Sequence, residues 1–119
     1  NAKQMVDQYN GKTRSGALSP SSKMSQFDLI REWADERGLY DKGDPKTQTL
    51  KLMEEAGEIC RAVLKNDRPE IIDGIGDCVV VLTNLAELNN VSIEDCIAAA
   101  YDEISNRTGK MVNGTFKKD

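Results

Sequence analysis

The sequence predicts an all-α fold, a bundle of four to five helices, on two observations. Apolar residues recur at three- and four-residue steps over most of residues 24–107, the spacing of one helical face. Gly, Pro and Asn interrupt this pattern at short intervals, while no repeat and no convincing strand pattern appears. A chain of 119 residues is long enough for one domain with a modest core. A single helical bundle is therefore expected.

The folded domain is expected to span residues 24–119. Residues 1–23 are polar, rich in Gly, Ser, Lys and Gln, and lack apolar periodicity. We interpret them as a flexible leader.

The first helix is predicted from Met24 to Arg37, with Ser25 as its N-cap. Its apolar positions recur at helical steps: Phe27, Ile30, Trp33 and Ala34. Gly38 and the loop at 41–45 end it.

Three longer helices are predicted to follow, over residues 45–65, 69–88 and 93–107. Asp44 can cap the first of them and Ser92 the last. The tail after Gly109 is short and carries an Asn113-Gly114 turn. The short break between the first two predicts that they pack antiparallel.

Composition excludes several kinds of function. The net charge is -4, from 16 basic and 20 acidic residues, so nothing favours binding along a nucleic-acid backbone. The chain contains no histidine, which removes Ser-His-Asp and Cys-His nucleophilic sites and His metal ligands. Any metal would be held mostly by oxygen, which favours Mg²⁺ or Mn²⁺.

The cysteines and the apolar runs favour a cytoplasmic protein. Cys60, Cys78 and Cys96 are odd in number and form no CxxC pair, so buried free thiols in a reducing compartment are expected. The longest apolar run, 78–82, is far too short to cross a bilayer, which needs about 20 residues. No membrane partner is expected.

Acidic side chains gather on one side of the predicted helix at 45–65. Glu55 and Glu58 are three residues apart, so both carboxylates point from one face into the same space. That side carries Lys51, Glu54, Glu55, Glu58, Arg61 and Lys65, while Leu52, Met53, Ala56, Ile59, Cys60, Val63 and Leu64 share the other. An ordinary solvated face is the competing interpretation.

The predicted helix at 69–88 is apolar on nearly every side, which is typical of a buried helix. A narrow stripe holding Glu70, Asp73, Asp77 and Asn84 interrupts it. Buried carboxylates are costly unless a cation compensates them. If this stripe faces Glu55 and Glu58, a divalent ion between the rows would relieve their repulsion. The alternative is that Asp73 and Asp77 face solvent or an oligomer interface.

Such a site suits phosphate chemistry, because Mg²⁺ binds through carboxylates together with substrate phosphates. The candidate cations for the outer phosphates are Lys51, Lys65, Arg107 and Lys110. Asn84 continues the acidic stripe and is a candidate substrate contact. Trp33 could stack on a base, but a lone Trp on an amphipathic helix is more often core, and we favour core.

Two motifs resemble those of the MazG-like all-α nucleotide pyrophosphohydrolases. Residues 48–58, Gln-Thr-Leu-Lys-Leu-Met-Glu-Glu-Ala-Gly-Glu, are similar to Q-x-x-K-L-x-E-E-x-x-E, and residues 73–77, Asp-Gly-Ile-Gly-Asp, resemble the second motif. Residues 33–45 resemble the helix that precedes these motifs in bacterial and phage members, and residues 107–114 resemble their C-terminus. The resemblance covers residues 24–117.

The resemblance implies an enzyme that splits a (deoxy)nucleoside triphosphate into the monophosphate and pyrophosphate. It implies Mg²⁺ or Mn²⁺, water attack at the α-phosphorus, and dimers or tetramers whose subunits share a site. Glu55, Glu58 and Asp77 match the metal-ligand positions, and Lys51 matches a phosphate contact. Glu54 is a further candidate ligand or general base, so Glu54 and Glu55 are the catalytic candidates.

One departure from the family motif concerns the second acidic pair. The family's E-x-x-D would place Glu at Gly74, whereas the acid here lies one residue earlier, at Asp73. Positions four and three residues before Asp77 lie on adjacent parts of one helical face. Asp73 is therefore expected to substitute, with a shorter arm.

Other functions are compatible with the same residues. One is a related pyrophosphohydrolase acting on a phosphoribosyl-nucleotide, on damaged nucleotides or on one phage dNTP pool. A second is a non-enzymatic helical dimerisation or adaptor module, whose stability would not depend on divalent ions. A third is a degraded enzyme that turns over slowly. The apolar helix at 69–88 makes self-association expected in each case.

Overall fold

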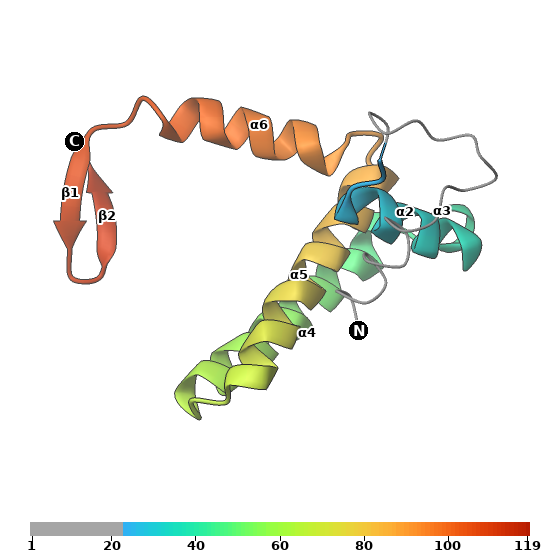
Figure 1. The fold of residues 1–119 in the computed structure, drawn as a ribbon, viewed down its shortest axis with the longest axis horizontal. Coiled ribbons are helices and arrows are strands. Elements are labelled where there is room, and N and C mark those ends of the chain that lie inside the picture. The colour runs from blue at the N-terminus through green and yellow to red at the C-terminus, as the bar shows by residue number, and fades with distance from the viewer. Residues whose placement is uncertain (1–22) are drawn as a thin grey trace.

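A computed structural model describes residues 23–119, in which five α-helices are followed by one β-hairpin (Figure 1). The expected leader at 1–23 lies outside the described residues except for Lys23. The elements are α2 (Gln26–Glu36), α3 (Leu39–Lys42), α4 (Pro45–Leu64), α5 (Arg68–Leu88), α6 (Ile93–Ile104), β1 (Gly109–Val112) and β2 (Thr115–Lys118). The predicted all-α class is confirmed.

The predicted helix starts are confirmed, because short polar side chains cap them. Ser25 accepts a hydrogen bond from the Asp28 amide and its own amide donates to the Asp28 carboxylate, a capping box. The Asp44 carboxylate accepts from the Thr47 amide, and Ser92 accepts from the Asp95 amide.

Two short elements were not predicted from the sequence. One is α3, a single helical turn where a loop was expected. The other is the β1–β2 hairpin, which corrects the expectation that the chain has no strand. Asn113 and Gly114 both have positive φ, 49° and 83°, as a two-residue hairpin turn of type I′ requires.

The centre of the fold is the antiparallel pair α4–α5, in which the chain reverses over residues 65–67 and the two helices lie side by side (Figure 1). Gly74 makes their close approach possible. A Cβ placed there would lie 2.7 Å from Cγ1 of Ile59 on α4. The side chain of Ile59 therefore occupies the space that a side chain at position 74 would need.

Within one chain, the pair buries polar groups and leaves apolar ones exposed, so α5 is not buried on every side by its own chain. The buried residues of α4 are Gln48, Glu55 and Ala62, which are seven apart and share one face. Large apolar side chains of both helices are exposed: Leu50, Met53, Val63, Leu64, Ile72, Ile75, Val79 and Leu82. One chain is too small to cover both helices on all sides.

Helix α6 leads away from the α4–α5 pair and carries the hairpin at its far end (Figure 1). Only Ile93, its first residue, is buried. The side chain of Arg31 on α2 holds this end of α6 by donating to both carboxylate oxygens of Glu94, at 2.7 and 2.6 Å. The same guanidinium donates to Asp28 at 2.7 Å. We call α6 with the hairpin the arm.

Two further expectations are corrected by the exposure of single side chains. Cys60 and Cys96 are exposed and Cys78 is half-buried, so the thiols are free but not buried. Trp33 is 39% exposed and its ring lies under the Arg37 guanidinium, 4.4 Å from the ring centroid, so it is not core. No helix among the described residues is long and apolar enough to span a membrane.

Candidate functional site

Glu55 lies at the centre of the candidate site, in the seam between α4 and α5. Its helix faces α5 with Gln48, Glu55 and Ala62, so the carboxylate is carried into the seam although it is charged. Only 8% of Glu55 is exposed, and its Oε2 atom is buried without a hydrogen-bond partner. An unpartnered buried carboxylate oxygen costs about 1–3 kcal/mol or more, so its burial is unfavourable unless a proton or a ligand satisfies it.

Neighbouring carboxylates add to the strain at Glu55. Burial raises the pKa of Glu55, and the charges of Glu58 and Asp77 raise it further. The pKa of the Cys78 thiol is also raised, by burial first and then by Glu55, Asp77 and Glu58. The charges of Glu58 and Asp77 therefore both act on the buried carboxyl group of Glu55.

Lys51 is the only cation whose ion pair with Glu55 is recorded among the described residues. Its Nζ atom lies 3.8 Å from Oε1 of Glu55, one helical turn away, and its side chain is 53% exposed. The pair is long and its lysine end is exposed to solvent, so it compensates the buried carboxylate only weakly. Lys51 therefore does not neutralise the site, and it is free to reach a second anion such as a phosphate.

The ligand types in the seam suit a divalent cation, but the side chains do not lie close enough together to coordinate one in this conformation. Carboxylate oxygens are the ligands that Mg²⁺ and Mn²⁺ prefer, and the orphan Oε2 of Glu55 offers one. Within residues 23–119, however, no three Asp, Glu or Cys side chains lie close enough together to hold a metal ion. Glu58 and Asp77 are exposed, so their side chains can turn toward Glu55 without disturbing the core.

The other two acidic candidates lie outside the seam. Glu54 and Asp73 are both exposed. Position 74, where the family motif has Glu, is buried against Ile59 and has no room for a carboxylate on this backbone. The departure from the motif is therefore accompanied by tighter packing of α5 on α4 at that position.

Asn84, a candidate substrate contact, is almost fully buried, at 2% exposure. Its Oδ1 accepts a hydrogen bond of 2.6 Å from the Tyr40 hydroxyl, which ties α3 to α5. Burial, with the charges of Glu87 and Asp35, raises the pKa of Tyr40 to about 12. Asn84 therefore has a structural role in this conformation.

The remaining candidates are not brought to the seam. Lys65 is exposed at the C-cap of α4, and Arg107 pairs with Glu103 at 2.8 Å on the arm. Lys110 is on β1, at the far end of α6 from the α4–α5 pair (Figure 1). Trp33 lies on α2 under Arg37.

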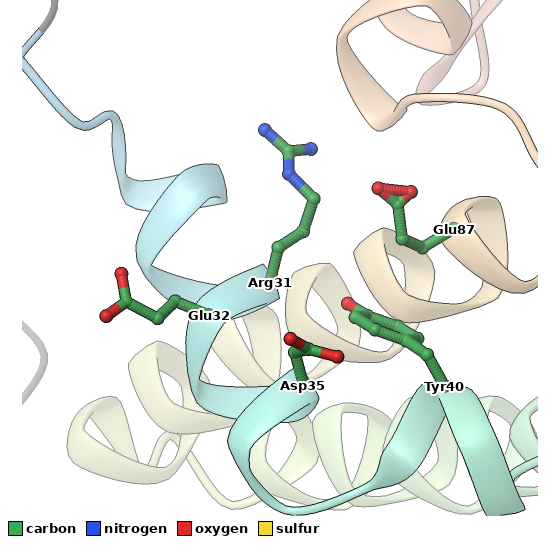
Figure 2. A pocket seen from close by; sticks show the side chains of 5 residues that line it. All are labelled: Arg31, Glu32, Asp35, Tyr40 and Glu87. Atoms are coloured by element: carbon green, nitrogen blue, oxygen red, sulfur yellow. The ribbon is translucent and has the colours of Figure 1, made fainter.

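Sequence reasoning missed a surface pocket of about 530 Å³ between α2, α3 and α5. Figure 2 shows its lining, which consists of Arg31, Glu32, Asp35, Tyr40 and Glu87. Three of these five side chains are acidic, and Arg31 is already paired with Asp28 and Glu94. Glu87 is ten residues from Asp77, about 15 Å along α5. The pocket is thus separate from the seam and disfavours phosphate.

Comparison with known proteins identifies related chains. Residues 44–112 match the family described as the MazG nucleotide pyrophosphohydrolase domain. This range contains α4, α5, α6 and β1, and with them every acidic candidate of the site.

Two relatives are themselves uncharacterised. An 18.2 kDa protein from the rep-hol intergenic region of Haemophilus phage HP1 is 47% identical over 62 residues, which cover 52% of this chain and 38% of the phage protein. The protein YvdC of Bacillus subtilis is 32% identical over 94 residues, covering 66% of this chain and 88% of YvdC. The chain thus spans well under half of the phage relative. No solved structure matches the chain.

Proposed function

The chain belongs to the MazG nucleotide pyrophosphohydrolase family, and on this premise we propose that it hydrolyses a (deoxy)nucleoside triphosphate to the monophosphate and pyrophosphate. The observation that carries the proposal is the buried, unpartnered Oε2 of Glu55 in the field of Glu58 and Asp77. A monomer gains no stability from such an arrangement. The arrangement becomes favourable if the carboxylates bind a cation that in turn binds the phosphates of the substrate.

We propose that Glu55, Glu58 and Asp77 hold Mg²⁺ or Mn²⁺, with Asp73 as an additional, exposed acid at the edge of the site. The bound cation would neutralise phosphate charge and make water a better nucleophile. Lys51 would bind an outer phosphate, since its pair with Glu55 is long and its side chain is exposed.

The reaction needs one water and one base. Water attacks the α-phosphorus, its proton passes to a carboxylate, and the bond from the α-phosphorus to the bridging oxygen breaks, so that pyrophosphate leaves. Glu54 is the candidate base, because it is exposed beside Glu55 and free to approach the attacking water. Asn84, Trp33 and Lys65 stand as weaker candidates for contacts to the nucleotide.

Self-association belongs to the same proposal. Arg107 and Lys110 lie on the arm, away from the seam of their own chain (Figure 1). They can contact a phosphate only if the arm reaches the seam of another copy. The site would then combine carboxylates of one chain with cations of a second.

The proposal is tested by incubating the protein with each common NTP and dNTP and a phosphoribosyl-nucleotide, with and without Mg²⁺ or Mn²⁺. Metal-dependent release of monophosphate and pyrophosphate, without diphosphate, is the expected result, and the ranking of substrates gives the base preference. Diphosphate with orthophosphate would overturn the point of attack. Absence of any turnover would favour the non-enzymatic helical module.

A further inference from the structure

The β1–β2 hairpin at the far end of α6 has two different faces (Figure 1). Its register pairs Lys110 with Lys117 and Met111 with Phe116. Because side chains alternate along a strand, these two pairs project from opposite sides of the hairpin. One side therefore carries two lysines, and the other carries two large apolar side chains.

Contacts within the hairpin hold it in shape. A Cβ at Gly109 would lie 2.7 Å from Cζ of Phe116, so the aromatic ring lies over the bare backbone of β1. The base of the hairpin is closed by Asp119. Its amide donates to the Thr108 carbonyl at 3.0 Å, and its carboxylate accepts from the Thr108 hydroxyl at 2.8 Å. The register that places the two lysines opposite each other is therefore set by the hairpin itself.

Lys110 and Lys117 face each other without a counter-charge. Directly opposite residues on one side of an antiparallel pair have Cβ atoms about 4.5–5.5 Å apart, and like charges at this distance are destabilising. Residues 109–118 include no acidic residue, and neither lysine forms an ion pair with any residue among 23–119. An anion lying between the two ammonium groups would relieve their repulsion and would be bound by both.

The proposed reaction provides such an anion. At the seam, the three carboxylates proposed as metal ligands outweigh the charge of a divalent ion, and Lys51 is the one cation proposed there for the phosphates. The proposed function adds two cations from the arm, of which Arg107 is already paired with Glu103 at 2.8 Å. The other is Lys110. Wherever Lys110 meets phosphate, the hairpin register brings Lys117 to the same place.

We propose that Lys117 binds the outer phosphates of the nucleotide together with Lys110, as a two-lysine clamp on the part that leaves as pyrophosphate. This rests on the proposed function, in which the arm reaches the seam of another copy. Lys117 lies on β2, beyond the range of 44–112 that matches the family. Lys118, the next residue, projects from the opposite side of the hairpin and takes no part in the clamp.

The kinetics of Lys117→Gln test the clamp, with Lys118→Gln as the matched control because it removes the same charge from the same strand. Lys117→Gln should lower kcat/KM for the preferred triphosphate at least about tenfold, the loss expected for one charge-assisted contact. The loss should appear mainly in KM, because the contact is present both before and during the reaction. Lys118→Gln should behave as wild type. Both lysines are exposed, so both variants should keep the wild-type melting temperature.

Product inhibition separates a phosphate contact from a structural role. In Lys117→Gln the inhibition constant of pyrophosphate should rise at least about tenfold, whereas that of the nucleoside monophosphate should not change, because the clamp contacts only the outer phosphates. Lys117→Arg keeps the charge and should retain most of the affinity for pyrophosphate. A loosened hairpin would weaken both inhibitors together.

Equal kinetics of Lys117→Gln and Lys118→Gln, or equal weakening of both inhibitors in Lys117→Gln, would overturn the proposal. Failure of the proposed function gives a different result. If the wild-type protein hydrolyses no nucleotide, the binding of pyrophosphate with Mg²⁺ is measured by calorimetry. Weaker binding to Lys117→Gln than to Lys118→Gln would support the clamp and contradict the hydrolysis alone, whereas equal or absent binding would contradict the clamp as well.

Discussion

The α4–α5 seam and the arm bury opposite kinds of residue. The seam encloses Gln48, Glu55 and Asn84, whereas the arm exposes Ile97, Tyr101 and Ile104. Neither arrangement favours the stability of a single chain, since charge is buried in one region and apolar surface is exposed in the other. In the function proposed above, each region is completed by something else: a cation with phosphate at the seam, and a second copy at the arm.

The largest expected effect is a loss of turnover when the acidic residues of the seam are replaced. Glu58→Gln and Asp77→Asn should each lower turnover at least about a hundredfold, because each removes a negative oxygen from the proposed cation site. Both side chains are exposed, so the fold should persist. Glu36→Gln on α2 is the matched control and should keep wild-type turnover. Wild-type activity in Glu58→Gln would contradict the site assignment.

The buried charge of Glu55 predicts that function and stability are opposed at this residue. Its raised pKa means that, without metal, its contribution to folding stability is fully present below its ordinary value of 4.5 and is lost as pH rises through the raised pKa. Glu55→Gln should therefore stabilise the metal-free protein at neutral pH by about 1 kcal/mol while turnover is lost. Urea unfolding at several pH values measures this. A destabilised variant at neutral pH would show that the charge is compensated.

The packing of the seam is tested by two glycines of α5. A Cβ at Gly74 would lie 2.7 Å from Cγ1 of Ile59, whereas one at Gly76 would meet nothing within 4 Å. Gly74→Ala should cost about 1 kcal/mol, as overpacking outweighs the gain in helix propensity. Gly76→Ala should gain about 0.5–1 kcal/mol from that propensity alone. Equal effects of the two changes on the melting temperature would mean that α5 does not approach α4 through Gly74.

The smallest effect concerns the link between α3 and α5. The Tyr40 hydroxyl donates to Asn84, and its pKa is raised to about 12. A raised pKa gives stability that is fully present below the ordinary value of 10 and lost as pH rises to about 12. Tyr40→Phe should cost about 1 kcal/mol at neutral pH and flatten the loss between these pH values. An unchanged alkaline profile would mean that the buried Tyr40 hydroxyl is not the source of this loss.

Local chemistry made the helices predictable. The caps of α2, α4 and α6 are Ser25, Asp44 and Ser92, each of which accepts a hydrogen bond from an amide three residues later. Such contacts are local in sequence, so they can be predicted from the sequence alone. The hairpin was missed although its Asn113-Gly114 turn was recognised, because strands of four residues carry too little alternation to be detected.

Which faces of α4 and α5 are buried was harder to predict than where the helices begin and end. Helical spacing placed Glu55 with Glu58 and Asp73 with Asp77, and the family resemblance selected Glu55, Glu58 and Asp77, but the sequence did not reveal that Glu55 is the buried one of the three. That depends on how α4 is rotated against α5, which the long-range contact of Gly74 with Ile59 helps to set. A single chain lacks the surface to cover α5 on every side, which is why its apolar sequence predicted self-association rather than complete burial within one chain.

The central claim, that the carboxylates of the seam bind a divalent cation, is tested most directly by thermal unfolding with and without Mg²⁺ or Mn²⁺. A ligand that binds only the folded state raises the melting temperature. The account predicts a clear rise for the wild-type protein and little or none for Glu58→Gln, with Glu36→Gln behaving as wild type. An unchanged melting temperature of the wild-type protein at millimolar metal, or an equal rise in Glu58→Gln, would contradict it.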